Sequence, residues 1–147
     1  MGRIVYGALS GVSISSDATQ DIWNLLAGTN KRISLHGWEL TSAAVAAALC
    51  SVSLQRVTTA GTGGSAVTEQ ASDEDSGTID SSMVTDVETP GTPDGVLMGY
   101  QWEQLGPVGH IWTPEMRPKS VDSQGFALVC NTAIAMTVSG WVCWEEH

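Results

Sequence analysis

Large apolar residues alternate with other residues near the C-terminal end of the chain, and few kinds of element accommodate that pattern. Within residues 134–144, the positions of one parity are Ile134, Met136, Val138, Gly140, Val142 and Trp144. A β-strand points alternate side chains to opposite faces, so the segment predicts a long strand with an apolar face. The other parity includes Trp141 and Cys143. A strand with two apolar faces has to be covered on both, which favours a central position in a sheet.

The same alternation recurs over much of the chain. In residues 50–57, Cys50, Val52 and Leu54 alternate with serine and glutamine, the pattern of a half-buried strand. Further strands are expected at 3–15, with a bend near Gly11, and at 22–26, 32–41, 96–102, 111–113 and 126–130. High helix propensity is confined to residues 41–49, enough for a helical turn or two. About eight short strands without crossover helices predict an all-β fold, an antiparallel β-sandwich of the jelly-roll type.

Length and charge indicate one domain with an uneven surface. A chain of 147 residues has the usual size of a single domain, so residues 1–147 are expected to form one β-sandwich. Residues 69–94 hold eight of the 16 acidic residues and no lysine or arginine. We expect this segment to be a long acidic surface excursion, because its apolar residues are few and unpaired carboxylates are costly to bury.

The net charge and the apolar stretches argue against two classes of partner. A net charge of −10 is unsuited to nucleic acid, which is bound through lysine and arginine, and to anionic lipid. The longest apolar stretch, residues 43–50, is less than half of the roughly 20 residues that a membrane-spanning helix needs. Residues 1–7 lack the apolar core of a secretory signal, so synthesis in a cytoplasm is expected. Neither a nucleic-acid nor a membrane partner is predicted.

The cysteines have no spacing typical of a disulfide framework or a zinc site. Cys50, Cys130 and Cys143 are odd in number and form no C-x-x-C pair. We therefore expect three reduced, buried thiols.

Other candidate chemical motifs are also incomplete. The sequence Asp73-Glu74-Asp75 resembles the start of a calcium loop, but Thr78 and Val84 stand where an EF-hand needs glycine and glutamate. No G-x-S-x-G elbow is present. The histidines are far apart and form no pair with metal-ligand spacing: His36, His110 and His147. We expect no metal, no cofactor and no enzymatic activity.

Tryptophan is unusually frequent, with six residues against one phenylalanine and two tyrosines. Tryptophan serves in cores, at subunit interfaces and as a platform for sugar rings, and the sequence leaves all three roles open. Trp141 and Trp144 have opposite parity in the final strand, so at least one of them is expected to meet a neighbouring subunit or covering loops. The candidates for an interface are Trp141, Trp144, Trp112 and Trp102.

Several segments together resemble the small virion proteins of tailed bacteriophages. They are the opening strand with Arg3-Ile4 and Tyr6, Gln20-Asp21-Ile22-Trp23, residues 31–40 ending in Trp38-Glu39-Leu40, Ser53-Leu54-Gln55-Arg56-Val57 leading into residues 61–68, and Pro114-Glu115-Met116-Arg117-Pro118 before two final strands. The likeness extends over most of the chain. The acidic segment and the alanine-rich segment depart from it.

This resemblance implies a capsid decoration or cement protein with no catalytic residues. Its implied partners are the major capsid protein or another shell protein and further copies of itself, as a trimer, and its location is the virion, assembled in the host cytoplasm. Two other classes stay open: a carbohydrate-binding β-sandwich module that uses exposed tryptophans, and a small hydrolase in which a histidine meets a serine and an acid.

Overall fold

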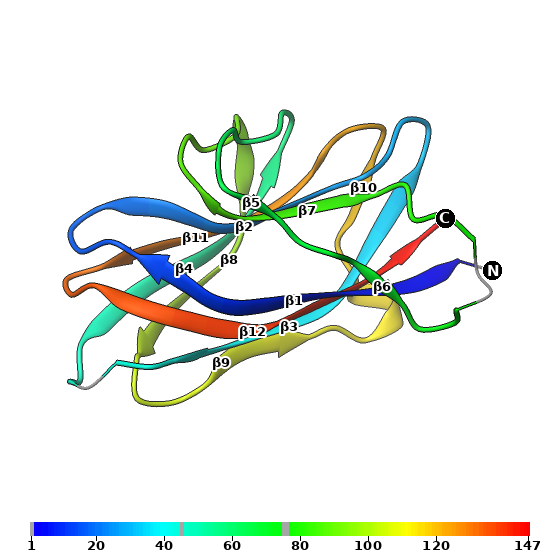
Figure 1. The fold of residues 1–147 in the computed structure, drawn as a ribbon. Helices are drawn as coiled ribbons and strands as arrows, with labels where there is room; N and C mark the ends of the chain where they lie inside the picture. The colour runs from blue at the N-terminus through cyan, green and yellow to red at the C-terminus, as the bar shows by residue number, and fades with distance from the viewer. Residues whose placement is uncertain (1, 45, 75–76) are drawn as a thin grey trace.

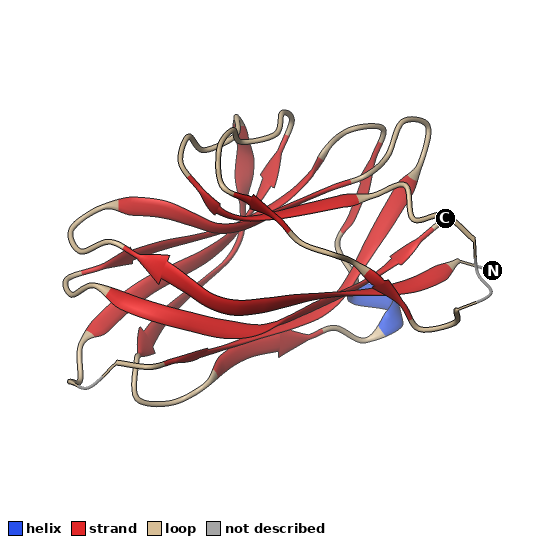
Figure 2. Cartoon of the chain, viewed as in Figure 1, coloured by secondary structure: helices blue, strands red, loops and turns tan. Residues whose placement is uncertain are grey.

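The computed structural model describes residues 2–44, 46–74 and 77–147, and these consist almost entirely of strands and loops (Figures 1 and 2). The strands, in chain order, are β1 (Arg3–Ile14), β2 (Thr19–Leu26), β3 (Arg32–Ser42), β4 (Leu49–Val57), β5 (Ser65–Ala66), β6 (Gln70–Ala71), β7 (Ser82–Val87), β8 (Pro93–Glu103), β9 (Val108–Ile111), β10 (Lys119–Val121), β11 (Gly125–Thr132) and β12 (Met136–Glu146). One 3₁₀ turn, η1 (Pro114–Met116), is the helical element of the described residues. The all-β prediction is confirmed.

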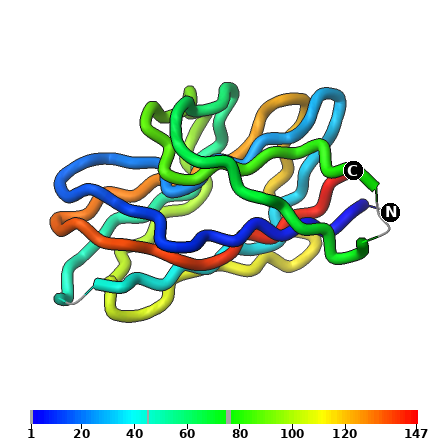
Figure 3. The backbone as a smooth tube through the Cα atoms, in the orientation of Figure 1, coloured from blue at the N-terminus to red at the C-terminus, as the bar shows by residue number. Residues whose placement is uncertain are grey.

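The strands form two antiparallel sheets that pack face to face. Sheet A has the order β10-β3-β12-β1-β6, with β9 also paired to β3, and sheet B has the order β5-β7-β2-β11-β4-β8. The first four strands pair with the later ones in reverse order: β1 with β12, β2 with β11, β3 with β9 and β4 with β8. Such a ribbon, folded back on itself and divided between two sheets, is a jelly roll. The tube in Figure 3 shows both chain ends at the same end of the sandwich.

The core lies between the two sheets and is rich in aromatic residues. Its largest fully buried side chains include Trp23, Trp38, Trp144 and Phe126. Strand β12 lies between β1 and β3, the central position that its two apolar faces predict. The expected bend in β1 is also present: the register shifts between Leu9 and Val12, and Gly11 has a φ of +65°. Positive φ is a conformation that glycine adopts without steric cost.

The helical turn expected at residues 41–49 is absent from the described part of that segment. Thr41 and Ser42 end β3, Leu49 begins β4, and no helix is found among residues 43, 44 and 46–48, while Val45 lies outside the described residues. The connection is too short to recover the cost of helix nucleation once its ends are held by strands. The backbone of its first residue is hydrogen-bonded outside the connection, because the Ala43 N–H donates to the Thr137 carbonyl at 2.9 Å.

Residues 69–94 are only partly the surface excursion that their charge predicts. Strand β7 lies inside this segment and pairs with both β2 and β5, and its Met83 and Val87 side chains are buried. The alternation of Met83, Thr85 and Val87 is a strand signal that the high acidic content obscured. None of the segment's described carboxylates is fully buried; Asp75 lies outside the described residues.

Candidate interaction surface

The outer face of sheet A, turned away from the core, carries a row of uncharged side chains. The register aligns Tyr6 of β1 with Cys143 of β12, Cys143 with Gly37 of β3, and Gly37 with Ile111 of β9. Tyr6 is 45% exposed and Ile111 is 74% exposed, whereas Cys143 between them is only 7% exposed. One row thus crosses the four strands that lie side by side in Figure 1.

A second row, two residues along, adds a tryptophan. Ala8 of β1 faces Trp141 of β12, Trp141 faces Glu39 of β3, and Glu39 faces Gly109 of β9. Trp141 is partly buried, and it lines the same surface depression as Ile111 of the first row. We call this set the outer apolar patch: Tyr6, Ala8, Ile111, Trp141 and Cys143.

The titratable groups of the outer apolar patch favour their neutral forms. Burial raises the pKa of the Cys143 thiol, and the adjacent Cys143 is the main cause that raises the pKa of the Tyr6 phenol. Both groups are therefore protonated at neutral pH. The five members of the patch are uncharged, and the exposed Glu39, which follows Trp141 in the second row, borders them.

Three of the four tryptophans expected at an interface are buried in the subunit instead. Trp144 is fully buried, and its indole N–H donates to the Ser81 hydroxyl at 2.9 Å. Trp102 is also buried, and its N–H donates to the Gly106 carbonyl at 2.7 Å. Trp112 packs on His110 with 4.7 Å between ring centroids. The inference for Trp144, Trp112 and Trp102 is corrected: these side chains complete the core, and Trp141 remains as the surface candidate.

Tyr6 and Ile111 are parts of this surface that sequence reasoning missed. Tyr6 has the opposite parity from the buried Val5 in β1, which is a usable signal. Ile111 ends a strand of four residues, too short for its parity to be read. Their proximity to Trp141 depends on which strands pair, and that is a property of the whole fold.

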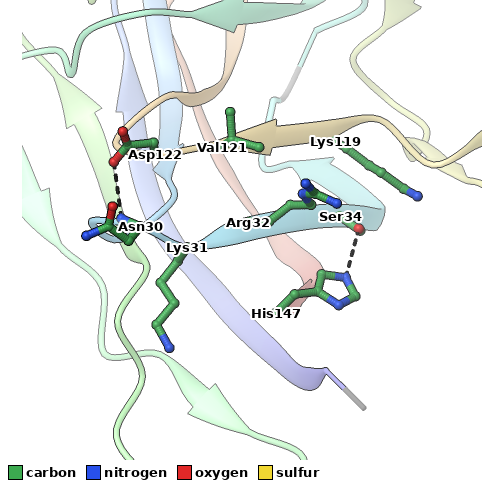
Figure 4. A pocket seen from close by; sticks show the side chains of 8 residues that line it. All are labelled: Asn30, Lys31, Arg32, Ser34, Lys119, Val121, Asp122 and His147. Atoms are coloured by element: carbon green, nitrogen blue, oxygen red, sulfur yellow. Dashed lines mark hydrogen bonds between the residues drawn. The ribbon is translucent and has the colours of Figure 1, made fainter.

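Five of the six lysine and arginine residues lie around two depressions at one edge of the sandwich. The first is lined by Asn30, Lys31, Arg32, Ser34, Lys119, Val121, Asp122 and His147 (Figure 4). The second shares Lys119 and adds Arg56 and Arg117 to the cations.

Contacts within the chain hold several of these cations apart. In Figure 4 the Lys31 and Lys119 side chains point in different directions, and the Lys31 ammonium is 3.2 Å from the Asp80 carboxylate. The Arg56 guanidinium donates to the Lys119 carbonyl and lies 5.7 Å from the centroid of the Phe126 ring. Lys31 and Arg56 are therefore each paired within the chain, and the Lys31 and Lys119 side chains do not point to a common site.

The histidines are divided between the core margin and this edge. The His36 Nε2 atom is 3.3 Å from the Glu145 carboxylate, which also lies 3.8 Å from Arg117 and 3.8 Å from His147. Burial is the main cause that lowers the pKa of His36, and the Arg117 cation lowers it further. The His147 ring also contacts the Ser34 hydroxyl at 3.1 Å (Figure 4).

The described residues offer neither a metal site nor a membrane-spanning helix. Among residues 2–44, 46–74 and 77–147, no three histidine, cysteine or acidic side chains are placed to hold a metal ion; Asp75 of the calcium-like sequence falls outside these ranges. In the same part of the chain, no helix has the length and apolar character needed to cross a membrane.

Comparison with known proteins gives no close relative and a remote structural similarity. No protein-family model matches the chain, and no curated protein matches it. Among solved structures, a chain from the structure of infectious bursal disease virus, Gx strain, is similar at 15% sequence identity, with a TM-score of 0.15. The alignment covers 99% of this chain and 39% of the viral chain, so this chain spans about two fifths of the length of its match.

Proposed function

We propose that this protein is a structural component of a bacteriophage virion that decorates or cements the capsid through protein–protein contacts, without catalysis. The observation that carries the proposal is the outer apolar patch on sheet A. A sandwich of two sheets needs only their inner faces for its core. The patch is a second apolar face, and it contributes nothing to the interior of the subunit.

Leaving such a face in contact with water is unfavourable. Ile111 is 74% exposed and Tyr6 is 45% exposed, and both lie across the sheet from the partly buried Trp141. An apolar patch bordered by polar residues marks a protein contact site, because burying it removes apolar surface from water at about 25 cal/mol per Å². Tryptophan and tyrosine are also the residues that contribute most per side chain to such contacts.

The partners follow from the same surface together with the resemblance to phage virion proteins. We propose that the outer apolar patch contacts further copies of this chain in a closed trimer, and that the trimer binds the major capsid protein or another shell protein. Closed rotational symmetry buries one face of every copy without forming an open fibre. The number three rests on the resemblance alone. The protein would be assembled in the host cytoplasm and would reside in the virion.

The burial of the tryptophans weighs against a carbohydrate-binding module. Such a module needs flat, exposed tryptophan rings on which sugars stack. Trp23, Trp38, Trp102, Trp112 and Trp144 are all buried, which leaves Trp141 as the remaining platform. A single partly buried ring supports protein contact better than sugar stacking.

Labelling of intact virus particles tests the proposed function. Antibodies raised against the purified chain are used to label particles recovered from the culture in which its gene is expressed. Regularly spaced label on intact heads is expected, together with the chain at constant stoichiometry in particles banded on a density gradient. Recovery of the chain only in the soluble, particle-free fraction would refute the proposal.

A further inference from the structure

Two of the three cysteines face each other across neighbouring strands of sheet B. Cys50 lies on β4 and Cys130 on β11, and the register pairs Cys50 with Thr132 and Val52 with Cys130. The two cysteines are therefore diagonal neighbours, and both point into the core, with exposures of 0% and 1%. Their sulfur atoms are 2.6 Å apart. Their separation of 80 positions in the sequence conceals this proximity.

We propose that Cys50 and Cys130 are a peroxide-sensitive thiol pair, and that oxidation by a hydroperoxide joins them in a disulfide that ties β4 to β11. This inference is independent of the virion proposal. It concerns a modification within the subunit, on the opposite sheet from the outer apolar patch.

The reaction proceeds in two balanced steps. The Cys50 sulfur attacks the peroxide, the O–O bond breaks, and the products are a sulfenic acid on Cys50 and one water, or one alcohol from an organic peroxide. The Cys130 thiol then attacks the Cys50 sulfur, the S–O bond breaks, and a second water leaves with the thiol proton. Two thiols have lost two electrons and two hydrogens, and the peroxide has taken them up.

The contact between the thiols selects Cys50 for the first step. The two thiols form a hydrogen-bond contact in which either sulfur can donate, and this contact with Cys130 lowers the pKa of Cys50. The same contact, together with burial, raises the pKa of Cys130. Because the thiolate is the reactive species, Cys50 reacts with peroxide and Cys130 resolves the product.

The pair is buried, but its position near a strand end and on paired strands leaves little movement to expose it and to complete the bond. A disulfide needs sulfur atoms about 2.05 Å apart on chains that are already close, and β4 and β11 are hydrogen-bonded neighbours. Cys50 is the second residue of β4 and directly follows Leu49, which is 68% exposed, so it lies near the end of a strand. A small peroxide needs only local opening there to reach it.

Cys143 is a natural internal control. It lies on β12 in sheet A, on the outer face beneath Tyr6, whereas the pair lies on the inner face of sheet B. It therefore stays a thiol when the pair is oxidised.

Thiol counting on the wild-type protein tests the proposal directly. The reduced protein is freed of reductant, treated with one equivalent of hydrogen peroxide, unfolded in guanidinium without reductant, and alkylated with iodoacetamide before mass spectrometry. The expected product has lost two hydrogens, carries one alkyl group at Cys143, and yields a peptide pair linked through Cys50 and Cys130. Three alkylated cysteines, added oxygen in place of lost hydrogen, or a disulfide that includes Cys143 would each overturn the proposal.

Matched alanine variants assign the effect to the pair. Cys143→Ala should keep the loss of two hydrogens and a higher melting temperature after peroxide, because the disulfide restrains a long loop of the unfolded chain. Cys50→Ala should lose both responses. A melting temperature that rises with peroxide in Cys50→Ala as much as in the wild type contradicts the assignment. If Cys50→Ala fails to fold, the thiol count on the wild type decides the question by itself.

Discussion

His36 illustrates how the position of one side chain sets a response to pH. Its ring lies on β3 opposite Glu145 of β12, with Arg117 and His147 also close to that carboxylate. The nearby carboxylate favours the charged imidazolium, but burial and the Arg117 cation outweigh it and lower the pKa of His36. Folding therefore favours the neutral ring.

This preference gives the sign of a pH effect on stability. Below about pH 6.5, the ordinary pKa of histidine, the unfolded chain takes up a proton at His36 before the folded chain does. The contribution of His36 is thus present above that pH and is lost as the pH falls from there through the lower pKa of the folded ring. His36→Gln should lose less stability than the wild type between about pH 7.5 and pH 5.5, measured as urea midpoints. Equal losses in the two proteins would show that His36 is not the group responsible.

Truncation of two tryptophans three residues apart should cost very different amounts of stability. Trp144 is fully buried between the sheets, so Trp144→Ala should lower the free energy of unfolding by about 3–5 kcal/mol. Trp141→Ser, on the outer face, should cost the isolated subunit less than about 1 kcal/mol. Urea unfolding followed by circular dichroism, at a concentration low enough to keep each protein monomeric, measures both. Similar losses would mean that Trp141 belongs to the core.

Strand β7 turns part of an acidic segment into a structural element. Met83 is buried under β1, where a Cβ on Gly7 would collide with the Met83 sulfur. Met83→Ala should therefore lower the free energy of unfolding by about 2–5 kcal/mol. The paired change Glu74→Gln and Asp94→Asn, at exposed positions of the same segment, should change it by no more than about 0.5 kcal/mol. Thermal melts at moderate salt compare them, and the reverse order of effects would contradict a core role for β7.

The centre of sheet A depends on a residue without a side chain. Gly140 of β12 pairs with Leu9 of β1 and with Leu40 of β3, and a Cβ there would collide with the Glu39 carbonyl. Gly140→Ala should destabilise the protein by at least about 1–3 kcal/mol, because backbone of a central strand must move. Gly99→Ala in the edge strand β8 is the matched control, since nothing lies within 4 Å of its Cβ. If both variants melt alike, the close approach at Gly140 is not a constraint.

The local pattern of apolar residues predicted the strands well where a period of two dominates, as in β4 and β12. It failed for β7, where Met83 and Val87 stand in a segment rich in acidic residues, and at residues 43, 44 and 46–48, where alanine propensity was outweighed by the strands at both ends. It also missed the contact between Cys50 and Cys130. That contact follows from the pairing of β4 with β11, which no local window contains. The outer apolar patch was predicted in part. The parity of Trp141 in the final strand placed it on the face opposite Trp144, but only the strand order shows that Tyr6 and Ile111 lie on the same surface.

The basic side chains and the outer apolar patch lie on different parts of the molecule. Five of the six basic side chains lie around two depressions at one edge, where Lys31 pairs with Asp80 of the acidic segment. The five members of the outer apolar patch are uncharged, with the exposed Glu39 at its border. A strong net negative charge opposes non-specific association, so contact between copies has to come from a surface where repulsion is low. The patch is such a surface.

Light scattering coupled to size-exclusion chromatography determines whether that surface is used. Wild-type protein at micromolar concentration should elute with the mass of a closed oligomer, three chains in the proposed trimer. Trp141→Ser should shift it toward the monomer while its circular dichroism spectrum stays unchanged. Leu49→Ser, which removes an apolar side chain that is 68% exposed on sheet B, should leave the mass at the wild-type value. A wild-type protein that is monomeric over the whole concentration range would contradict self-association through the outer apolar patch.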